Sequence, residues 1–226
     1  MAAASAQEWD AAEEPSELLE LPQCVDNRKL RLLCCVCVRR VFDDAGTSNF
    51  ASAISFAEAW CDGDFVREDW LEHRRIVGRI RKPRGRVSQI RKYMWIAEAA
   101  YASLERPTVN WQRAMQSCLE AGAYGGSGEL EAAEQCRLVR DIFPNPFREF
   151  SFDPAWLEWN DGTVSKLAHA IYDDRHFEDL PVLGDALEEA GCNDPLILDH
   201  CRSETEHVRG CWVVDLMTGR DNTFRK

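Results

Sequence analysis

Apolar residues recur at helical spacing along most of this chain, and this pattern limits the fold more than any other feature. The clearest example runs from Val164 to Tyr172, where apolar side chains occupy positions i, i+3, i+4, i+7 and i+8. Such spacing places them on one face of a helix, which can then be buried. Runs that alternate apolar and polar residues, as half-buried strands do, are nearly absent apart from residues 211–216. The sequence therefore predicts a mainly α, compact, bundle-like domain with little or no sheet.

The expected helices begin at capping residues and end at glycine or proline. Asp26, Ser48 and Asp64 are typical N-caps in front of apolar stripes. The predicted helices cover residues 27–40, 50–60, 65–80, 87–106, 110–119, 130–143, 164–172, 180–190 and 195–201. On the first of them we expect the cationic side chains to stay in water, namely Arg28, Lys29, Arg31, Arg39 and Arg40.

The chain organisation is predicted from changes in composition. Residues 1–24 are rich in Ala and Glu and indicate a mobile acidic arm with one short helix near residues 16–21. A helical region follows over residues 25–121, and a glycine-rich segment at 122–128 is predicted to be a flexible linker. Residues 129–226 then form a C-terminal helical module that contains an irregular, aromatic-rich segment at 147–159. This segment carries too much aromatic surface to leave in water, so we expect it to pack on the C-terminal helices.

Composition argues against several classes of protein. The formal charge of −12 disfavours general affinity for nucleic acid. Ten cysteines in 226 residues fall below the ~8–10% of a disulfide scaffold, so reduced thiols that fill the core are expected. The longest apolar run, residues 32–38, is far shorter than the ~20 residues that span a bilayer, and the N-terminus lacks a signal peptide. The sequence thus predicts a cytoplasmic protein with no membrane association.

One strongly basic segment contrasts with the acidic chain. Between residues 74 and 92, hereafter the basic segment, no acidic residue occurs. The segment could dock an acidic protein partner, or it could follow a phosphate backbone with neighbouring aromatic residues stacked on the bases. A solvated helix face that pairs with the chain's own carboxylates is the plainer alternative. The candidate partner-binding residues are Arg74, Arg75, Arg79, Arg81, Lys82, Arg84, Arg86, Arg91 and Lys92.

Histidine and cysteine gather near the C-terminus. His200, Cys201, His207 and Cys211 are candidate zinc ligands, because zinc prefers thiolate and imidazole in a tetrahedron. His200 and Cys201 are neighbours that point apart, and the usual C-x-x-C knuckle is missing, so buried packing cysteines are the interpretation that we favour. The residues also allow a thiol nucleophile, with Cys211, His207 and Asp215 as the example.

A second group of cysteines lies on the first long helix. Cys34 and Cys37 share one face of this helix, and a metal site there would need two further ligands from elsewhere in the chain. Core packing is the alternative that we favour for this group.

Two parts of the chain resemble one bacterial family that occurs in many paralogous copies. The residues from Leu138 to Gly219, which contain HCR at 200–202 and HVRGCWVVDL at 207–216, are similar to its C-terminal module. Residues 28–40 are similar to its first helix. The family brings no assigned fold, activity or ligand, and its many copies imply specialised partners. The resemblance also implies one fixed constellation, which here consists of His200, Cys201, His207, Arg209, Gly210, Cys211, Trp212 and Asp215.

These patterns leave three functions open. The first hypothesis is a non-enzymatic helical module for protein–protein interaction, with the basic segment or the middle of the chain as the partner surface. The alternatives are a zinc-binding or thiol-dependent enzyme built on the C-terminal His and Cys residues, and nucleic-acid binding through the basic segment. No cofactor is predicted, with zinc kept open as the one candidate. Bound metal, thiol reactivity and salt-dependent affinity distinguish the three.

Overall fold

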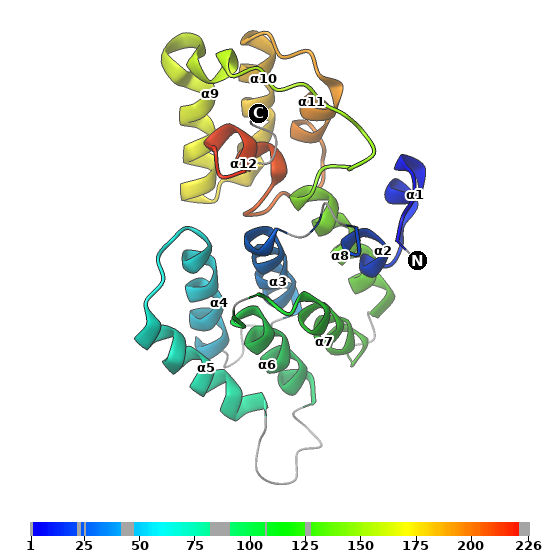
Figure 1. The fold of residues 1–226 in the computed structure, drawn as a ribbon, viewed down its shortest axis with the longest axis vertical. Coiled ribbons are helices and arrows are strands. Elements are labelled where there is room, and N and C mark those ends of the chain that lie inside the picture. Colours follow the sequence, from blue (N-terminus) through cyan, green and yellow to red (C-terminus); the bar gives the residue numbers. More distant parts are fainter. Residues whose placement is uncertain are drawn as a thin grey trace. The chain divides into compact units, whose positions relative to one another are not determined.

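The computed structural model describes residues 2–21, 24, 26–41, 48–81, 91–106, 108–124 and 128–221 (Figure 1). Within these ranges all regular structure is helical and no strand occurs, which confirms the predicted mainly α fold. The alternating residues 211–216 lie largely in a helix, Trp212–Thr218, and not in a strand. None of the described helices is long and apolar enough to cross a membrane.

The chain forms two compact units, Met1–Val139 and Arg140–Lys226. In the first unit, α3 (Asn27–Val41) lies among α4 (Ser48–Cys61), α6 (Arg91–Ser103) and α7 (Trp111–Tyr124) and contacts all three (Figure 1). The helix α5 (Arg67–Arg81) packs against α4 and α6. The sequence forms α3 because Leu30, Leu33, Cys34 and Cys37 recur at helical spacing, and all four are buried.

The boundary between the units differs from the glycine-rich segment at which the sequence places it. The helix α8 (Gly128–Ile142) follows that segment, and most of it belongs to the first unit. Gln135 Nε2 of α8 donates to the carbonyl oxygen of Met115 on α7 over 3.3 Å, and Arg40 of α3 lies 3.7 Å from Glu131. These contacts attach the start of α8 to the N-terminal core, whereas residues 125–127 of the predicted linker lie outside the described residues.

The first residues carry more structure than the predicted mobile arm. Two short helices occur there, α1 (Ala6–Ala11) and α2 (Pro15–Leu19), where the sequence predicts one. Ser5 caps α1 by accepting a hydrogen bond from the Glu8 amide at 3.2 Å. Trp9 is only 1% exposed, and Leu18 is fully buried. Burial of these two side chains holds the segment in place, because exposing them would cost roughly 1.5–3 kcal/mol each.

The second unit packs four helices around one apolar core. After the last turn of α8 come α9 (Ala155–Asp174), the 3₁₀ helix η2 (Phe177–Asp179), α10 (Leu180–Glu189), α11 (Pro195–Cys201) and α12 (Trp212–Thr218). Helix α9 contacts α10 and α12, and α11 contacts α10 and α12 (Figure 1). Asn160, Asp161 and Gly162 all have positive φ and interrupt α9, so helical backbone resumes at Thr163 and the apolar stripe begins at Val164.

Most of the aromatic-rich segment packs as the sequence predicts, but Phe147 is 39% exposed. Phe150 and Phe152 lie against the C-terminal core, and the ring of Phe150 is 4.9 Å from that of Trp212. The segment is fixed at its backbone as well, because the amide of Ser151 donates to Asp194 Oδ2 at 2.7 Å. Asp194 also accepts from the Leu196 amide at 3.0 Å and so caps α11. The start of α11 and the aromatic segment are therefore positioned by one carboxylate.

Candidate metal centre

Four side chains with metal-binding atoms meet inside the C-terminal unit. One ligand atom from each lies within 4.8 Å of the others, and no second group of this kind occurs among the described residues. Its members, hereafter the metal group, are Asp141, His200, His207 and Cys211.

Separate segments of the chain supply these residues. Asp141 lies in the last turn of α8, just before Pro144 and Pro146 stop the chain from continuing as a helix. His200 lies in the last turn of α11, and Cys211 is the residue directly before α12. His207 occupies the loop between them, where the amide of Cys211 donates to the carbonyl of Val208 and closes a turn.

The ligand atoms are close enough to share one ion. His207 Nδ1 lies 2.6 Å from Asp141 Oδ1, and His200 Nε2 lies 3.3 Å from the same oxygen. His200 Nε2 is also 3.2 Å from Cys211 Sγ. Both imidazole rings thus turn a nitrogen toward one carboxylate oxygen, and the thiol lies beside it.

A second set of contacts fixes the orientation of these ligands. The other carboxylate oxygen, Asp141 Oδ2, accepts a hydrogen bond from the Val208 amide at 2.9 Å. The other nitrogen of His207, Nε2, is 3.1 Å from the Ser203 hydroxyl, which leaves Nδ1 for the centre of the group. The ring of His200 packs 5.1 Å from that of Trp212. Such outer contacts are typical of metal sites, where they set the tautomer and direction of each ligand.

The group is shielded from solvent, and burial changes its acid–base properties. Burial opposes ionisation of Asp141, but hydrogen bonds from His200 and His207 outweigh it and lower the pKa of the carboxyl below its usual value. Burial, followed by the charge of Asp141, raises the pKa of the Cys211 thiol well above its usual value. A carboxylate is therefore available as a ligand, while the thiol keeps its proton until a cation replaces it.

The structure brings together three of the four ligands that the sequence predicts. His200, His207 and Cys211 belong to the metal group, whereas Cys201 does not. Cys201 is fully buried beside α10, where a Cβ added at Gly184 would lie 2.9 Å from the Cys201 Cβ. Asp141 takes the fourth position, and sequence reasoning missed it because it lies 66 residues before His207.

The geometry differs from that of a catalytic thiol. His200, and not His207, faces Cys211, and Asp215 is outside the group. A base that activates a thiol uses one ring nitrogen for the thiol and the other for its carboxylate. Here Nε2 of His200 faces both the thiol and Asp141. Together with the fully buried sulfur, this arrangement favours shared coordination over proton transfer.

None of the ten cysteines forms a disulfide, and nine of them are buried. Burial raises the pKa of Cys34, Cys61 and Cys201 to about 12, so roughly one thiol in ten thousand is ionised at pH 8. We therefore expect a colorimetric disulfide reagent to react slowly with the native protein at pH 8 and to titrate ten thiols after denaturation. The rate should rise about tenfold per pH unit, because the thiolate fraction does. Rapid labelling of Cys211 in the native protein, located by peptide mapping, would contradict this expectation.

The basic segment is only partly described. Arg74 donates to the hydroxyl of Tyr101 and lies 4.3 Å from the centre of that ring. Arg75 pairs with Glu72 of the same helix, and Arg79 is exposed. Residues 82–90, and the side chains at 81, 91 and 92, lie outside the described part of the chain. Of the described candidate residues, Arg75 pairs with a carboxylate of the chain, whereas Arg74 contacts a tyrosine. The partner-binding role of the nine candidate residues stays a prediction.

Comparison with known proteins assigns no family to this chain. No family model, curated protein or solved structure matches it. The resemblance to a bacterial paralogous family therefore stays a prediction. Asp141, His200, His207 and Cys211 offer one oxygen, two nitrogen and one sulfur atom, which are atoms that transition-metal ions prefer as ligands.

Proposed function

We propose that this chain is a non-enzymatic helical module whose C-terminal unit is stabilised by one zinc ion. The observation that carries the proposal is the convergence of an Asp oxygen, two imidazole nitrogens and a thiol sulfur within 4.8 Å. Imidazole and thiolate are preferred ligands of zinc, and a single carboxylate is compatible with them. Zinc also replaces the protons that now lie between these atoms, as metal binding in general does.

Two of the distances between ligand atoms match the edges of a zinc tetrahedron, and ligand atoms that lie up to 4.8 Å apart would have to move closer. Zinc bonds of about 2.0–2.1 Å to nitrogen or oxygen and ~2.3 Å to sulfur give tetrahedron edges of about 3.3–3.6 Å. His200 Nε2 lies 3.3 Å from Asp141 Oδ1 and 3.2 Å from Cys211 Sγ, close to those edges. The contact of 2.6 Å between His207 Nδ1 and Asp141 Oδ1 would lengthen by about 0.7 Å, which a small rotation of either side chain supplies.

A structural role is favoured over a catalytic one. Four protein ligands complete a zinc tetrahedron, whereas catalytic zinc keeps one position open for water or substrate. The side chains of Asp141 and His207 are each 4% exposed, and Cys211 is fully buried, so substrate has little access. Such a site would join the end of α8 to α11 and α12, which are only seven residues long and gain little stability by themselves. The protein-binding role of the module stays a prediction.

Elemental analysis of the purified protein tests the site directly. We expect one zinc per chain, and we expect Cys211→Ser to lose it, since a serine hydroxyl is a poor zinc ligand at neutral pH. Cys201→Ser is the matched control, because Cys201 is a buried cysteine of the same unit that lies outside the metal group. It should keep the full zinc content.

Cobalt(II) substitution provides a second measurement that does not depend on the metal acquired during expression. Cobalt in a tetrahedral site with one thiolate should show a sulfur-to-cobalt charge-transfer band, which disappears in Cys211→Ser and persists in Cys201→Ser. The proposal fails if the chelated protein takes up neither zinc nor cobalt, or if Cys201→Ser abolishes binding while Cys211→Ser does not.

A further inference from the structure

Three aromatic side chains form a cluster where α4 meets α5 in the N-terminal unit. Trp60 lies in the last turn of α4, Phe65 in the following turn and Trp70 in the first turns of α5. The ring of Phe65 is 5.0 Å from that of Trp60 and 6.4 Å from that of Trp70. All three side chains are partly exposed, so the cluster, hereafter the aromatic cage, borders solvent.

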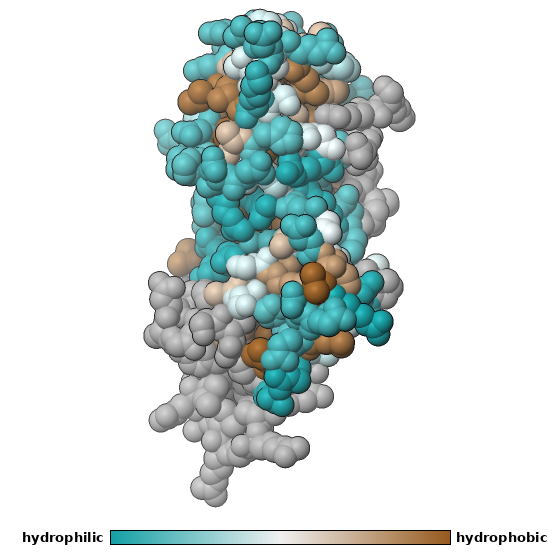
Figure 2. All heavy atoms as spheres, turned by 90° about the vertical axis from the view of Figure 1, so that its left-hand side faces the viewer, coloured by the Kyte–Doolittle hydropathy of each residue, from teal (hydrophilic) through white to brown (hydrophobic). Residues whose placement is uncertain are grey.

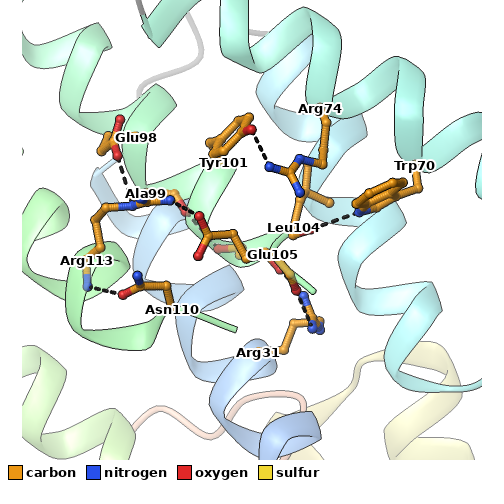
Figure 3. A network of polar contacts seen from close by, with 11 residues as sticks. Arg31, Trp70, Arg74, Glu98, Ala99, Tyr101, Leu104, Glu105, Asn110 and Arg113 are labelled. Atoms are coloured by element: carbon orange, nitrogen blue, oxygen red, sulfur yellow. Dashed lines mark hydrogen bonds and ion pairs between the residues drawn. The ribbon is translucent and has the colours of Figure 1, made fainter. Parts of the chain in front are cut away.

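The walls of the cage are fixed by contacts with neighbouring helices. Gly63 has φ of +101°, a conformation that suits glycine, and its amide donates to the carbonyl of Trp60 at 3.1 Å. This turn brings Phe65 back toward Trp60. The indole Nε1 of Trp70 donates to the carbonyl of Leu104 at 2.9 Å, which fixes that ring beside the end of α6 (Figure 3).

A cation already occupies the space that the rings enclose. The guanidinium carbon of Arg106 lies 4.5 Å from the centre of Phe65, 5.6 Å from that of Trp60 and 5.7 Å from that of Trp70. Each distance is within the ~6 Å at which an aromatic face attracts a cation. Arg106 is exposed, and its guanidinium has no ion pair among the described residues. Arg31 lies 3.7 Å from the centre of the Trp60 ring, and Arg74 lies 5.1 Å from that of Trp70, but Arg106 is within 6 Å of all three rings. Arg106 can leave the cage without breaking an ion pair among the described residues.

The surroundings of the cage favour a positive ligand. Between residues 61 and 69 the one basic residue is Arg67, whereas four are acidic. Asp64, Glu68 and Asp69 are exposed, and Asp62 pairs with Arg28 over 3.6 Å. Such an excess of negative charge attracts cations and raises their local concentration.

Two exposed aliphatic residues are neighbours of cage residues in the sequence. Val66 is 48% exposed and Leu71 is 51% exposed. Figure 2, which looks onto the side of α4 and α5, shows hydrophobic atoms at the surface of the N-terminal unit beside hydrophilic ones.

We propose that Trp60, Phe65 and Trp70 bind organic cations of the methylated ammonium class, and that Arg106 occupies this cage as an internal competitor. A methylated ammonium group is weakly hydrated and bulky, so it gains more from three aromatic faces than a compact inorganic cation does. Arg106 has to leave the cage before a ligand enters, so the affinity of the wild-type protein is reduced by the fraction of time for which Arg106 is bound.

Titration with tetramethylammonium, followed by tryptophan fluorescence at constant ionic strength, tests the proposal. We expect Arg106→Ala to bind the probe saturably and about tenfold more tightly than the wild-type protein. Arg67→Ala is the matched control, because it removes an exposed arginine of the same surface and should leave the wild-type affinity unchanged. Adding Phe65→Leu to Arg106→Ala keeps a side chain of similar hydrophobicity but removes one aromatic face, and should weaken binding several-fold.

The charge of the ligand supplies the decisive comparison. Choline and its uncharged analogue 3,3-dimethylbutan-1-ol have the same shape, so only choline should bind to Arg106→Ala. Equal binding of the two would overturn the proposal, since a plain hydrophobic pocket would then explain it. Absence of saturable binding in Arg106→Ala, with its helical content unchanged by circular dichroism, would overturn it as well. A peptide with one trimethyllysine, compared with choline, identifies whether a protein or a small molecule is the better source of the group.

Discussion

Replacing Asp141 with Ala is expected to lower the free energy of unfolding of the C-terminal unit by about 3–5 kcal/mol. The carboxylate is 4% exposed and lies within hydrogen-bonding distance of His207, His200 and the Val208 amide. Removing it leaves a buried N–H group and two imidazoles without their acceptor, which costs more than a lost surface ion pair. Chemical denaturation, followed by hydrogen exchange of peptides from residues 140–221, measures the loss where it occurs.

Asp199→Ala is the control for this substitution. Asp199 lies next to His200 on α11 but is exposed, so its removal should change the stability by less than about 0.5 kcal/mol. Equal exchange protection in the two variants would show that the buried carboxylate does not organise this unit. Repeating the measurement with and without a chelator separates the contributions of zinc and of hydrogen bonds to the stability lost in Asp141→Ala. The contribution of zinc disappears on chelation, whereas that of the hydrogen bonds remains.

Helix positions could be predicted from the sequence where local signals agree. The helix α11 runs from Pro195 to Cys201 as predicted, because Asp194 caps its start and Pro195 suits the first turn. The second part of α9 likewise follows its apolar period. The predicted start at residue 164 agrees with the break at residues 160–162, whereas the helical residues 155–158 before the break were not predicted. The helix α12 was not predicted, because Val213 and Val214 favour a strand by their local pattern. In the structure both side chains are buried in the core as part of a helix.

The candidate site could be predicted only where its ligands are close in sequence. His200, His207 and Cys211 lie within twelve residues, and the sequence singles them out together. Adjacent helical residues diverge by about 100°, so of His200 and Cys201 only one can face the group, and the structure selects His200. Asp141 lies at the far end of an earlier helix. Its role depends on how α8 packs in the C-terminal unit, for which the sequence carries no local signal.

Charged residues were the least predictable part of the N-terminal unit. The sequence places Lys29 and Arg31 in water, yet they are 4% and 2% exposed. An arginine side chain ordinarily stays in water, but it can be buried where hydrogen-bond acceptors from another part of the chain replace that water. At Arg31 those acceptors are the carbonyls of Ser103 and Glu105, more than seventy residues away (Figure 3). Such a contact is formed only by the folded chain and leaves no pattern within either segment.

Replacing Arg31 with Ala should therefore destabilise the N-terminal unit by about 3 kcal/mol. Arg31 donates to the carbonyl of Ser103 and, over 3.1 Å, to that of Glu105, where the last carbonyls of α6 have no helical partner. Its guanidinium also lies 3.7 Å from the centre of the Trp60 ring. Thermal unfolding and hydrogen exchange of peptides from α3 and α6 measure the effect.

Arg39 on the same helix provides the matched comparison, because its side chain is 34% exposed and its partner is the carboxylate of Glu58 rather than a helix end. Arg39→Ala should cost less than Arg31→Ala because the Arg39 side chain is partly solvated, although the substitution also removes a cation from the carboxylate of Glu58, whose side chain is 5% exposed. Arg31→Lys should lie between the two alanine variants, since lysine keeps the charge but cannot reach both carbonyls with one planar group. If Arg31→Ala and Arg39→Ala lower the unfolding temperature equally, the buried guanidinium is not what joins α3 to the end of α6. A larger decrease in the unfolding temperature for Arg31→Ala, with faster hydrogen exchange confined to residues 27–41 and 91–106, would show that the Arg31 guanidinium joins α3 to the end of α6.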